Sequence, residues 1–271
     1  MSTKQSEEGK TRLTFEELPE WIYKCPWCSS CQGLYKTQWP NQTYDPVCPI
    51  MDVIEYESGT PGGLLWLIRG GLEGLVPWDT RTLEHLYSCS TCKLCELQCY
   101  GDHAEHITDI IVTTRERLIE DGNVLPKVRD FLENVRKHGN PWGEAKSKRG
   151  DWAKGISEAK AYKPDVEFLY YVGCEGSYDP VGQRMARSLA ELLAEAKVSF
   201  GILGNEEECD GNEVRLLGEV GLFKMLSQKN IEKFSKLGVK KVVTLCHRTR
   251  ITHLRTNIHS LGRSCITPNC F

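Results

Sequence analysis

The chain has 271 residues, which is enough for two domains with hydrophobic cores of ordinary size. Its 34 Lys and Arg residues nearly balance its 37 Asp and Glu residues, which argues against a global field that attracts nucleic acid or a membrane surface. The longest apolar stretch, residues 62–76, contains Arg69 and Glu73 and is shorter than a spanning helix, so we expect no transmembrane segment.

The first half of the chain is predicted to be helical. Residues 1–20 are expected to form a disordered arm, and residues 21–135 a helical domain that holds the first eight cysteines. Apolar residues at helical spacing, with Gly122 as a stop signal, predict helices at residues 63–72, 83–85 and 107–120.

Residues 136–164 are predicted to be a linker, because Gly and Pro residues interrupt the pattern there. After Lys137 and the Gly139–Gly143 stretch, a basic run follows that contains Lys146, Lys148 and Arg149. A charge run of this kind is usually a solvated strap, and we expect these side chains to lie in solvent rather than to bind a partner.

A different pattern begins at residue 165, where strands alternate with helices. The predicted strands are Val166–Val172, Val198–Leu203 and Val239–Leu245, and the predicted helices between them are Pro180–Ala196 and Glu213–Leu237. This βαβαβ order predicts an open parallel sheet with helices on its faces. The fold class is therefore α+β or α/β, with a helical domain followed by a small parallel-sheet domain at residues 165–271.

Cysteine content is the most informative feature of the composition. The 13 cysteines are an odd number, and the polar N-terminus does not resemble a signal peptide. In a reducing compartment such thiols indicate metal ligands or catalytic groups rather than disulfides. We therefore expect a cytoplasmic protein, or one that associates with a membrane through a partner.

The strongest motif is the run Cys89-x2-Cys92-x2-Cys95-x3-Cys99. Three thiolates from one tight turn suit a [4Fe-4S] cluster, and the fourth cysteine of such a run ligates the other cluster in two-cluster ferredoxins. A second run exists, Cys25-x2-Cys28-x2-Cys31. It lacks a fourth cysteine at the usual spacing, but Cys48 follows and precedes Pro49, as in the bacterial pattern.

These runs predict that residues 21–135 form a helical ferredoxin-like domain with two [4Fe-4S] clusters and crossed ligation. The first cluster is predicted to bind Cys25, Cys28, Cys31 and Cys99. The second cluster is predicted to bind Cys89, Cys92, Cys95 and Cys48. The alternative is that these cysteines bind zinc. Structural zinc sites use pairs of cysteines in C-x2-C groups, and the two groups of three cysteines here do not match that pattern well. His103 and His106 are expected at a helix N-terminus or on the surface rather than as ligands.

Three later cysteines follow the three predicted strands: Cys174, Cys209 and Cys246. Ligands of open α/β sheets bind at the carboxyl ends of the strands, so these cysteines are candidates for a third metal or redox site. Scattered core cysteines are the alternative, because free cysteine is often buried as a small apolar residue. Cys265 and Cys270 lie in a tail without periodicity and receive no role.

The chain resembles a family of iron–sulfur subunits that includes those of heterodisulfide reductase and of anaerobic glycerol-3-phosphate dehydrogenase. The resemblance covers about residues 20–262. Its motifs are the two cysteine runs separated by Gly59-Thr60-Pro61-Gly62-Gly63, the connector Gly139-Asn140-Pro141-Trp142-Gly143, and Tyr171-Val172-Gly173-Cys174. The last of these is similar to the opening of the family's cysteine-rich CCG domain.

The resemblance implies a non-cubane cluster, or zinc, in that domain. The spacing matches, with 34 residues between Cys174 and Cys209 and 34 between Gly211 and Cys246. Asp210 and Thr249 stand where the family has two further cysteine ligands. Relatives also carry a second copy of the repeat, which does not fit before the end of this chain. We therefore expect a degenerate, truncated, single-copy CCG-like domain.

The expected function is electron transfer, by an iron–sulfur subunit that serves an oxidoreductase complex of anaerobic metabolism and is not catalytic alone. One alternative is a heterodisulfide-reductase-like catalyst that uses a third metal centre at Cys174, Cys209 and Cys246. Another is a structural subunit. The expected partner is a catalytic oxidoreductase subunit, which could be a flavoprotein, a tungsten or molybdenum reductase, or a membrane quinone-reactive protein. No nucleic-acid partner is expected.

Overall fold

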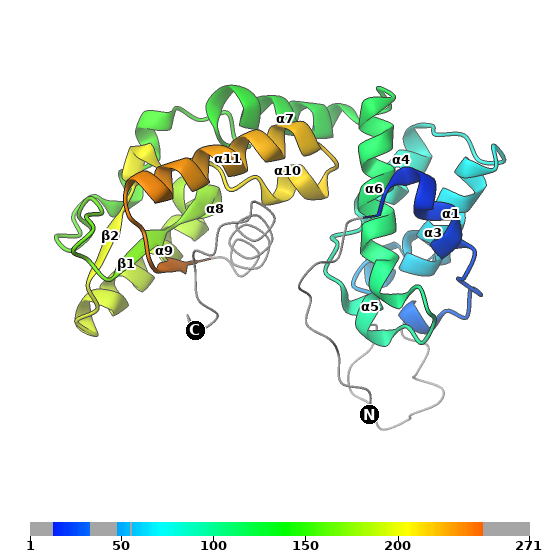
Figure 1. Ribbon diagram of the computed structural model, residues 1–271, viewed down its shortest axis with the longest axis horizontal. Coiled ribbons are helices and arrows are strands. Elements are labelled where there is room, and N and C mark those ends of the chain that lie inside the picture. The colour runs from blue at the N-terminus through cyan, green and yellow to red at the C-terminus, as the bar shows by residue number, and fades with distance from the viewer. Residues whose placement is uncertain (1–12, 33–47, 55, 246–271) are drawn as a thin grey trace. The chain divides into compact units, whose positions relative to one another are not determined.

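The computed structural model describes residues 13–32, 48–54 and 56–245, which divide into two compact units (Figure 1). The first unit comprises Met1–Leu125 and Leu216–Gly218, and the second comprises Pro126–Arg215 and Glu219–Phe271. The segment 136–164 therefore groups with the second unit, where Trp152 belongs to the hydrophobic core. None of the described helices is both long and apolar enough to cross a membrane.

Short helices build the first unit. They are α1 (Leu18–Ile22), α2 (Met51–Ile54), α3 (Pro61–Leu72), α4 (Thr80–Ser88), α5 (Leu94–Gln98) and α6 (Ile107–Glu120). Helix α6 has the predicted bounds, and Gly122 ends it with a φ of 79°. Helix α3 packs against α6, and both contribute fully buried aliphatic side chains, among them Leu64, Ile68 and Ile111.

Two adjacent glycines of α3 differ in the space around them. A Cβ on Gly63 would come within 1.9 Å of the carbonyl oxygen of Glu57, which is backbone and cannot move aside easily. At Gly62 the nearest atom to a Cβ would be Cys31 Sγ at 3.4 Å, which is an ordinary contact. The start of α3 can therefore approach the Glu57 backbone only because residue 63 has no side chain.

Substitution of Gly63 by alanine is expected to lower the free energy of unfolding of the first unit by about 1–3 kcal/mol, the usual cost of overpacking. Urea denaturation of the full chain measures this change. The matched control is Gly62→Ala, because both substitutions give the same gain in helix propensity and only one creates a clash. Equal stabilities of the two variants would contradict the prediction.

The second unit contains a parallel sheet in the strand order β2-β1-β3. Its strands and helices are α7 (Pro126–His138), β1 (Phe168–Tyr171), α8 (Gly173–Tyr178), α9 (Pro180–Glu195), β2 (Phe200–Ile202), α11 (Val220–Lys236) and β3 (Val242–Thr244). Leu169 of β1 pairs with Gly201 of β2 and with Val242 of β3. The small parallel sheet predicted from the alternating pattern is thus confirmed.

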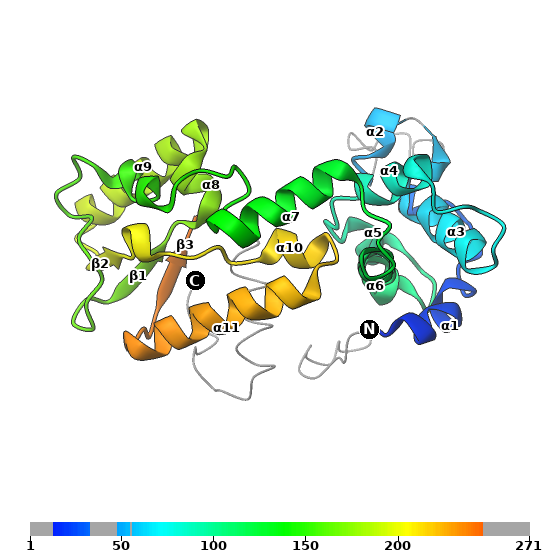
Figure 2. The same cartoon turned by 90° about the horizontal axis from the view of Figure 1, so that it is seen from above.

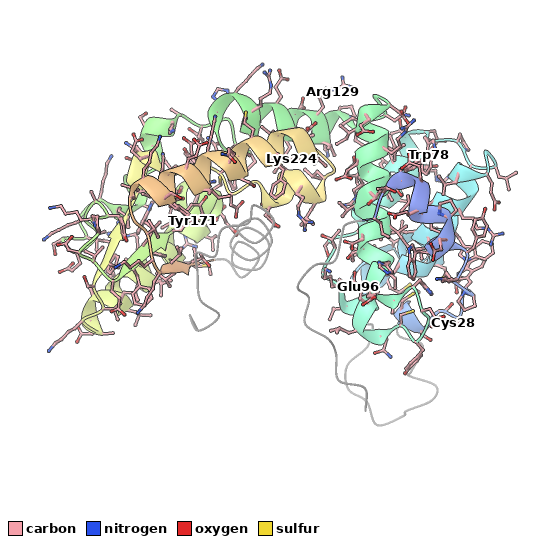
Figure 3. All side chains as sticks on the ribbon, viewed as in Figure 1. Cys28, Trp78, Glu96, Arg129, Tyr171 and Lys224 are labelled. Carbon is pink, nitrogen blue, oxygen red and sulfur yellow. The ribbon has the colours of Figure 1, made fainter. Side chains whose placement is uncertain are left out.

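Helices cover both faces of this sheet (Figure 2). Tyr170 packs with Ala186 and Ala190 of α9, whereas its neighbour Tyr171, labelled in Figure 3, packs with Phe234 of α11. The alternation follows from the period of two in a strand, because successive side chains point to opposite faces. Strand β1 is therefore buried on both sides, as its continuous apolar sequence requires.

The prediction of one long helix at Glu213–Leu237 is wrong, because the segment forms two helices, α10 (Asn212–Leu216) and α11. Gly218 adopts a φ of 102°, which is outside the helical region. Glu219 then begins the second helix, since its carboxylate accepts hydrogen bonds from the N–H groups of Gly221 and Leu222. An acidic residue that caps the N-terminus is favourable there, because it satisfies free N–H groups.

Candidate metal centres

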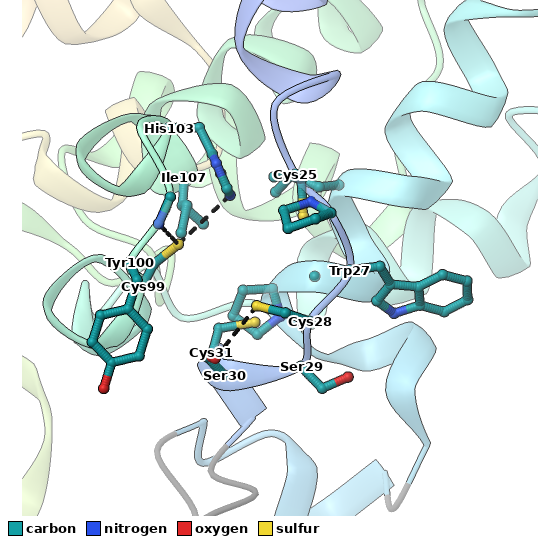
Figure 4. Close-up of a pocket in the computed structure, with 15 residues that line it drawn as sticks. Cys25, Trp27, Cys28, Ser29, Ser30, Cys31, Cys99, Tyr100, His103 and Ile107 are labelled. Atoms are coloured by element: carbon teal, nitrogen blue, oxygen red, sulfur yellow. Dashed lines mark hydrogen bonds between the residues drawn. The ribbon is translucent and has the colours of Figure 1, made fainter.

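Four predicted ligands line one cavity in the first unit. Cys25, Cys28 and Cys31 follow α1, and Cys99 follows α5. All four border a cavity of about 220 Å³ (Figure 4). This is the set predicted for the first cluster, in which Cys99 joins the distant triplet instead of the run to which it belongs in sequence.

The two cysteine loops share an unusual backbone conformation. In each loop the residues directly before and after the middle cysteine have positive φ values, although none of them is glycine. The φ values are 53° at Trp27, 63° at Ser29, 53° at Thr91 and 67° at Lys93. Such residues cost of order 1–3 kcal/mol each and cluster at functional sites. Because the same strained conformation occurs in both loops, we infer that both present their cysteines in the same way.

Main-chain N–H groups point at one sulfur of each predicted ligand set. The Thr91 N–H donates to Cys89 Sγ at 3.4 Å, and the Gly101 N–H donates to Cys99 Sγ at the same distance. Hydrogen bonds of this kind stabilise a thiolate and help to set the potential of an iron–sulfur cluster. The loops therefore offer the surroundings that thiolate ligands need.

Cys48 lies beside the second cysteine run. Burial raises the pKa of the Cys48 thiol, and the nearby Cys89 and Cys92 raise it further. Burial also raises the pKa of Cys95, with Cys89 as the next cause. The structure thus brings Cys48 to the run from which it is distant in sequence, as the crossed assignment requires.

The donor set fits iron–sulfur clusters. Burial raises the pKa of the Cys31 thiol to about 11, so this sulfur keeps its proton unless a cation binds it. Within the described residues, no group of three or more His, Cys, Asp or Glu side chains converges on the position of a single metal ion. A cubane uses one cysteine for each of its irons, so its ligands surround a larger volume than those of zinc.

His103 borders the first cavity on the side of Cys99. Its side chain is 2% exposed, and its Nε2 atom lies 3.7 Å from Cys99 Sγ (Figure 4). Gly101 leaves the room for this ring, because a Cβ there would come within 2.5 Å of His103 Cε1. Burial lowers the pKa of His103. His103 is buried and lies at the N-terminus of the 3-10 helix Ala104–His106, and His106 lies at the N-cap position of α6, so both histidines are at a helix N-terminus as expected.

Cys174 and Cys209 meet at the carboxyl edge of the sheet in the second unit. Cys174 follows β1 and Cys209 follows β2, and both pack into one cluster with Val214 and Phe223. In the order β2-β1-β3 the chain adds β2 on one side of β1 and then β3 on the other, and α/β sheets bind ligands at the end of a strand where the order reverses in this way. Cys246 and Thr249 lie outside the described residues.

Arg149 contacts Cys174, one cysteine of this pair. Its guanidinium donates to Cys174 Sγ at 3.4 Å and to Glu207 Oε1 at 3.2 Å. The pKa of Cys174 is lowered, first by a hydrogen bond from Cys209 and then by the charge of Arg149. The prediction that Arg149 lies in solvent is wrong, because its side chain is only 2% exposed. It is buried with the carboxylate of Glu207 and the thiol of Cys174, both of which it contacts.

Asp210 occupies the position of a cysteine in the CCG pattern. Its side chain is buried, and Oδ1 accepts a hydrogen bond from the N–H of Asn212, where α10 begins. A hard carboxylate is a poor replacement for a thiolate at an iron–sulfur centre. The carboxylate therefore has a structural use that needs no metal.

Sequence reasoning missed several buried charges. Arg149 and Glu207 gave no local signal, because each lies in a polar stretch of the chain. Arg115 did give one, since it follows Ile111 by four residues and precedes Leu118 by three. Those spacings place Arg115 on the apolar face of α6, where a charged residue is unexpected.

A parallel sheet with cysteines at its carboxyl edge and two ferredoxin-type cysteine runs are features that this chain shares with iron–sulfur proteins that contain a cysteine-rich domain. Residues 168–248 match the model of the cysteine-rich domain family CCG. This match and the relatives below confirm the resemblance to CCG-domain iron–sulfur proteins that the sequence motifs indicated. No solved structure gives a significant match.

Three curated relatives illustrate the similarity. The "Probable iron-sulfur-binding oxidoreductase FadF" of Bacillus subtilis is 37% identical over 62% of this chain and 25% of its own length. The "EtfAB:quinone oxidoreductase" of Syntrophomonas wolfei is 32% identical over 65% of this chain and 25% of its own length. One subunit of the dihydromethanophenazine:CoB–CoM heterodisulfide reductase of Methanosarcina mazei is 24% identical over 60% of this chain and 39% of its own length. The chain thus spans a quarter to two fifths of these relatives.

Proposed function

We propose that the chain is an electron-transfer subunit of an oxidoreductase complex and that it relays electrons through two [4Fe-4S] clusters. The observation that carries this proposal is the convergence of Cys99 with Cys25, Cys28 and Cys31 on one cavity. The position of Cys48 beside the other run supports it. Relatives with iron–sulfur and oxidoreductase names support the general role.

The chain's own residues would hold and insulate these clusters. The eight cysteines would bind the irons, and main-chain N–H groups would stabilise the sulfurs. Leu65 and Ile107 border the first cavity and would limit the access of water, which lowers the local dielectric. When bound, each cluster supplies the uptake and release of single electrons.

The substrate chemistry would take place outside the described residues, because clusters of this type carry electrons without transforming a substrate. Of the expected partners, we favour one that exchanges electrons with a quinone. The support is the name of one relative, EtfAB:quinone oxidoreductase, which includes quinone. We place the protein in the cytoplasm, where thiols stay reduced.

Anaerobic purification followed by iron and sulfide analysis tests the proposal. We expect about eight iron atoms per chain from two cubane clusters, and an EPR spectrum of two interacting centres after reduction. A stable value near four iron atoms per chain would contradict the two-cluster proposal. Zinc in a stoichiometric amount, with little iron, would instead support the alternative that the cysteine runs bind zinc.

For the third site we propose a degenerate CCG centre that lacks the five-cysteine cluster. Cys174 and Cys209 are near each other, but the buried Asp210 closes a turn in the position of a third ligand. Anomalous scattering at the iron edge tests this proposal. A full non-cubane cluster beside Cys174 and Cys209 would contradict it and would favour the alternative function, a heterodisulfide-reductase-like catalyst.

A further inference from the structure

A buried cation adjoins the second cysteine run. Arg115 of α6 is 2% exposed, and its Nη2 donates to the carbonyl oxygens of Leu86 at 2.7 Å and Cys89 at 2.8 Å. Its Nη1 donates to the carbonyl oxygen of Leu216, which belongs to the same unit. The guanidinium thus joins α6 to the end of α4, at the point where the cysteine loop begins.

The charge of Arg115 has no carboxylate partner within the described part of the chain. All three acceptors of its side chain are main-chain carbonyl oxygens, and its Nε atom is buried without any partner. An isolated buried cation is costly, so buried charges are normally paired. A group that binds next to Arg115 and carries negative charge would supply the missing compensation.

The cysteine that Arg115 contacts is a predicted ligand of the second cluster. A cubane with four thiolate ligands is an anion, and reduction adds one further negative charge. A fixed positive charge close to the cluster stabilises the reduced form more than the oxidised form, because the attraction grows with the charge of the cluster. Arg115 would therefore raise the reduction potential of this cluster.

One acidic residue also lies near the second run, and its charge is offset. Glu96 of α5, which is labelled in Figure 3, accepts hydrogen bonds from the N–H and the hydroxyl of Thr108. Its Oε2 atom lies 3.3 Å from Lys93 Nζ. The pair contributes little net charge, so Arg115 remains the dominant unpaired charge at this run.

The first cavity has different surroundings. Among the described residues that line it there is no Lys, Arg, Asp or Glu. The groups that contact Cys99 Sγ there are the Gly101 N–H and the imidazole of His103. The wall of the first cavity thus offers hydrogen bonds and dipoles, whereas a buried full charge adjoins the second run.

We propose that Arg115 makes the cluster of Cys48, Cys89, Cys92 and Cys95 the higher-potential member of the pair. The inference rests on the proposed two-cluster function. Arg115 acts as a positioning residue, since it binds the carbonyl group of a ligand and holds a charge beside the cluster. The first electron that enters the chain then resides on the second cluster, and electrons move from the first cluster to the second.

Redox titration monitored by EPR tests this order in the anaerobically prepared full chain. Cys28 and Cys92 are the exposed middle cysteines of the two runs. The variants Cys28→Ala and Cys92→Ala therefore assign the signals, since each removes one cluster. We expect the wild-type signal that Cys92→Ala abolishes to have the higher midpoint potential.

The substitutions at Arg115 separate its charge from its hydrogen bonds. Arg115→Gln removes the charge and keeps a donor, so the midpoint of the second cluster should fall and that of the first should stay. Arg115→Lys keeps the charge and should remain close to wild type. The matched control is Arg117→Gln, on the same helix, because Arg117 is exposed and paired with Asp121.

Three results would overturn the inference. The first is a Gln variant with unchanged midpoints, and the second is an equal shift in the Gln and Lys variants, which indicates a structural role alone. The third is a wild-type protein in which the first cluster has the higher potential, and this result can be read even if no Arg115 variant folds. Failure of the two-cluster function is a distinct result, because the wild-type iron content would then fall short of about eight.

Discussion

Replacement of Cys99 by alanine is expected to halve the iron content, from about eight to about four atoms per chain. The cluster that should be lost is that of Cys25, Cys28 and Cys31, although Cys99 directly follows the other run in sequence. The physical reason is that Cys99 leaves α5 in an extended conformation and borders the cavity of the distant triplet. EPR after reduction shows which cluster signal remains.

The reciprocal variant is Cys48→Ala, which should remove the cluster of the second run and keep the first. Cys28→Ala and Cys92→Ala provide the reference spectra, because each removes a central ligand of one run. The crossed assignment predicts that Cys99→Ala resembles Cys28→Ala and that Cys48→Ala resembles Cys92→Ala. The opposite pairing would contradict it, and the clusters would then be ligated run by run.

Helices and strands with a strong repeating pattern could be predicted from the sequence. Helix α6 has the bounds that its apolar spacing and Gly122 indicated. Strand β1 lies within the predicted segment Val166–Val172 but is shorter, because strand ends are defined by their pairing partners. These elements were predictable because burial on one face, or on both, leaves a period in the sequence.

Burial of individual charges could not be predicted in the same way. Arg149 belongs to a basic stretch in which Lys146 and Lys148 are exposed, and nothing local distinguishes it from them. Its burial depends on Glu207, a residue far along the chain that returns to the same place only in the fold. The break at Gly218 is similar, because a helical pattern continues across it in the sequence.

The positive φ values on both sides of the middle cysteine in each loop could not be predicted from the sequence either. Cysteine spacing indicated a tight turn, but Trp27 and Thr91 are residues that normally avoid positive φ. Each lies directly before the middle cysteine of its run. There the backbone conformation follows from the need to place three cysteines close together, and not from the preference of the residue itself. This agreement between loops is structural support for the idea that they hold similar groups.

Replacement of Arg149 by methionine is expected to lower the free energy of unfolding of the second unit by about 3–5 kcal/mol, the usual effect of removing one partner of a buried ion pair. Glu207 would keep only the hydrogen bonds from the N–H groups of Val172 and Gly173. Urea denaturation measures the loss, and faster amide exchange in β1 assigns it to the second unit. The matched control is Lys148→Met, a neighbouring exposed cation, which should stay close to wild type.

The size of the loss should depend on the charge that remains. The double variant Arg149→Met with Glu207→Gln leaves no buried carboxylate, and a buried pair is often replaceable by neutral groups at little cost. We therefore expect the double variant to be more stable than Arg149→Met alone, with a coupling energy that a double-mutant cycle measures. Strict additivity of the two single changes would show that Arg149 acts mainly through Cys174 and the carbonyl oxygens of Gly139 and Glu208.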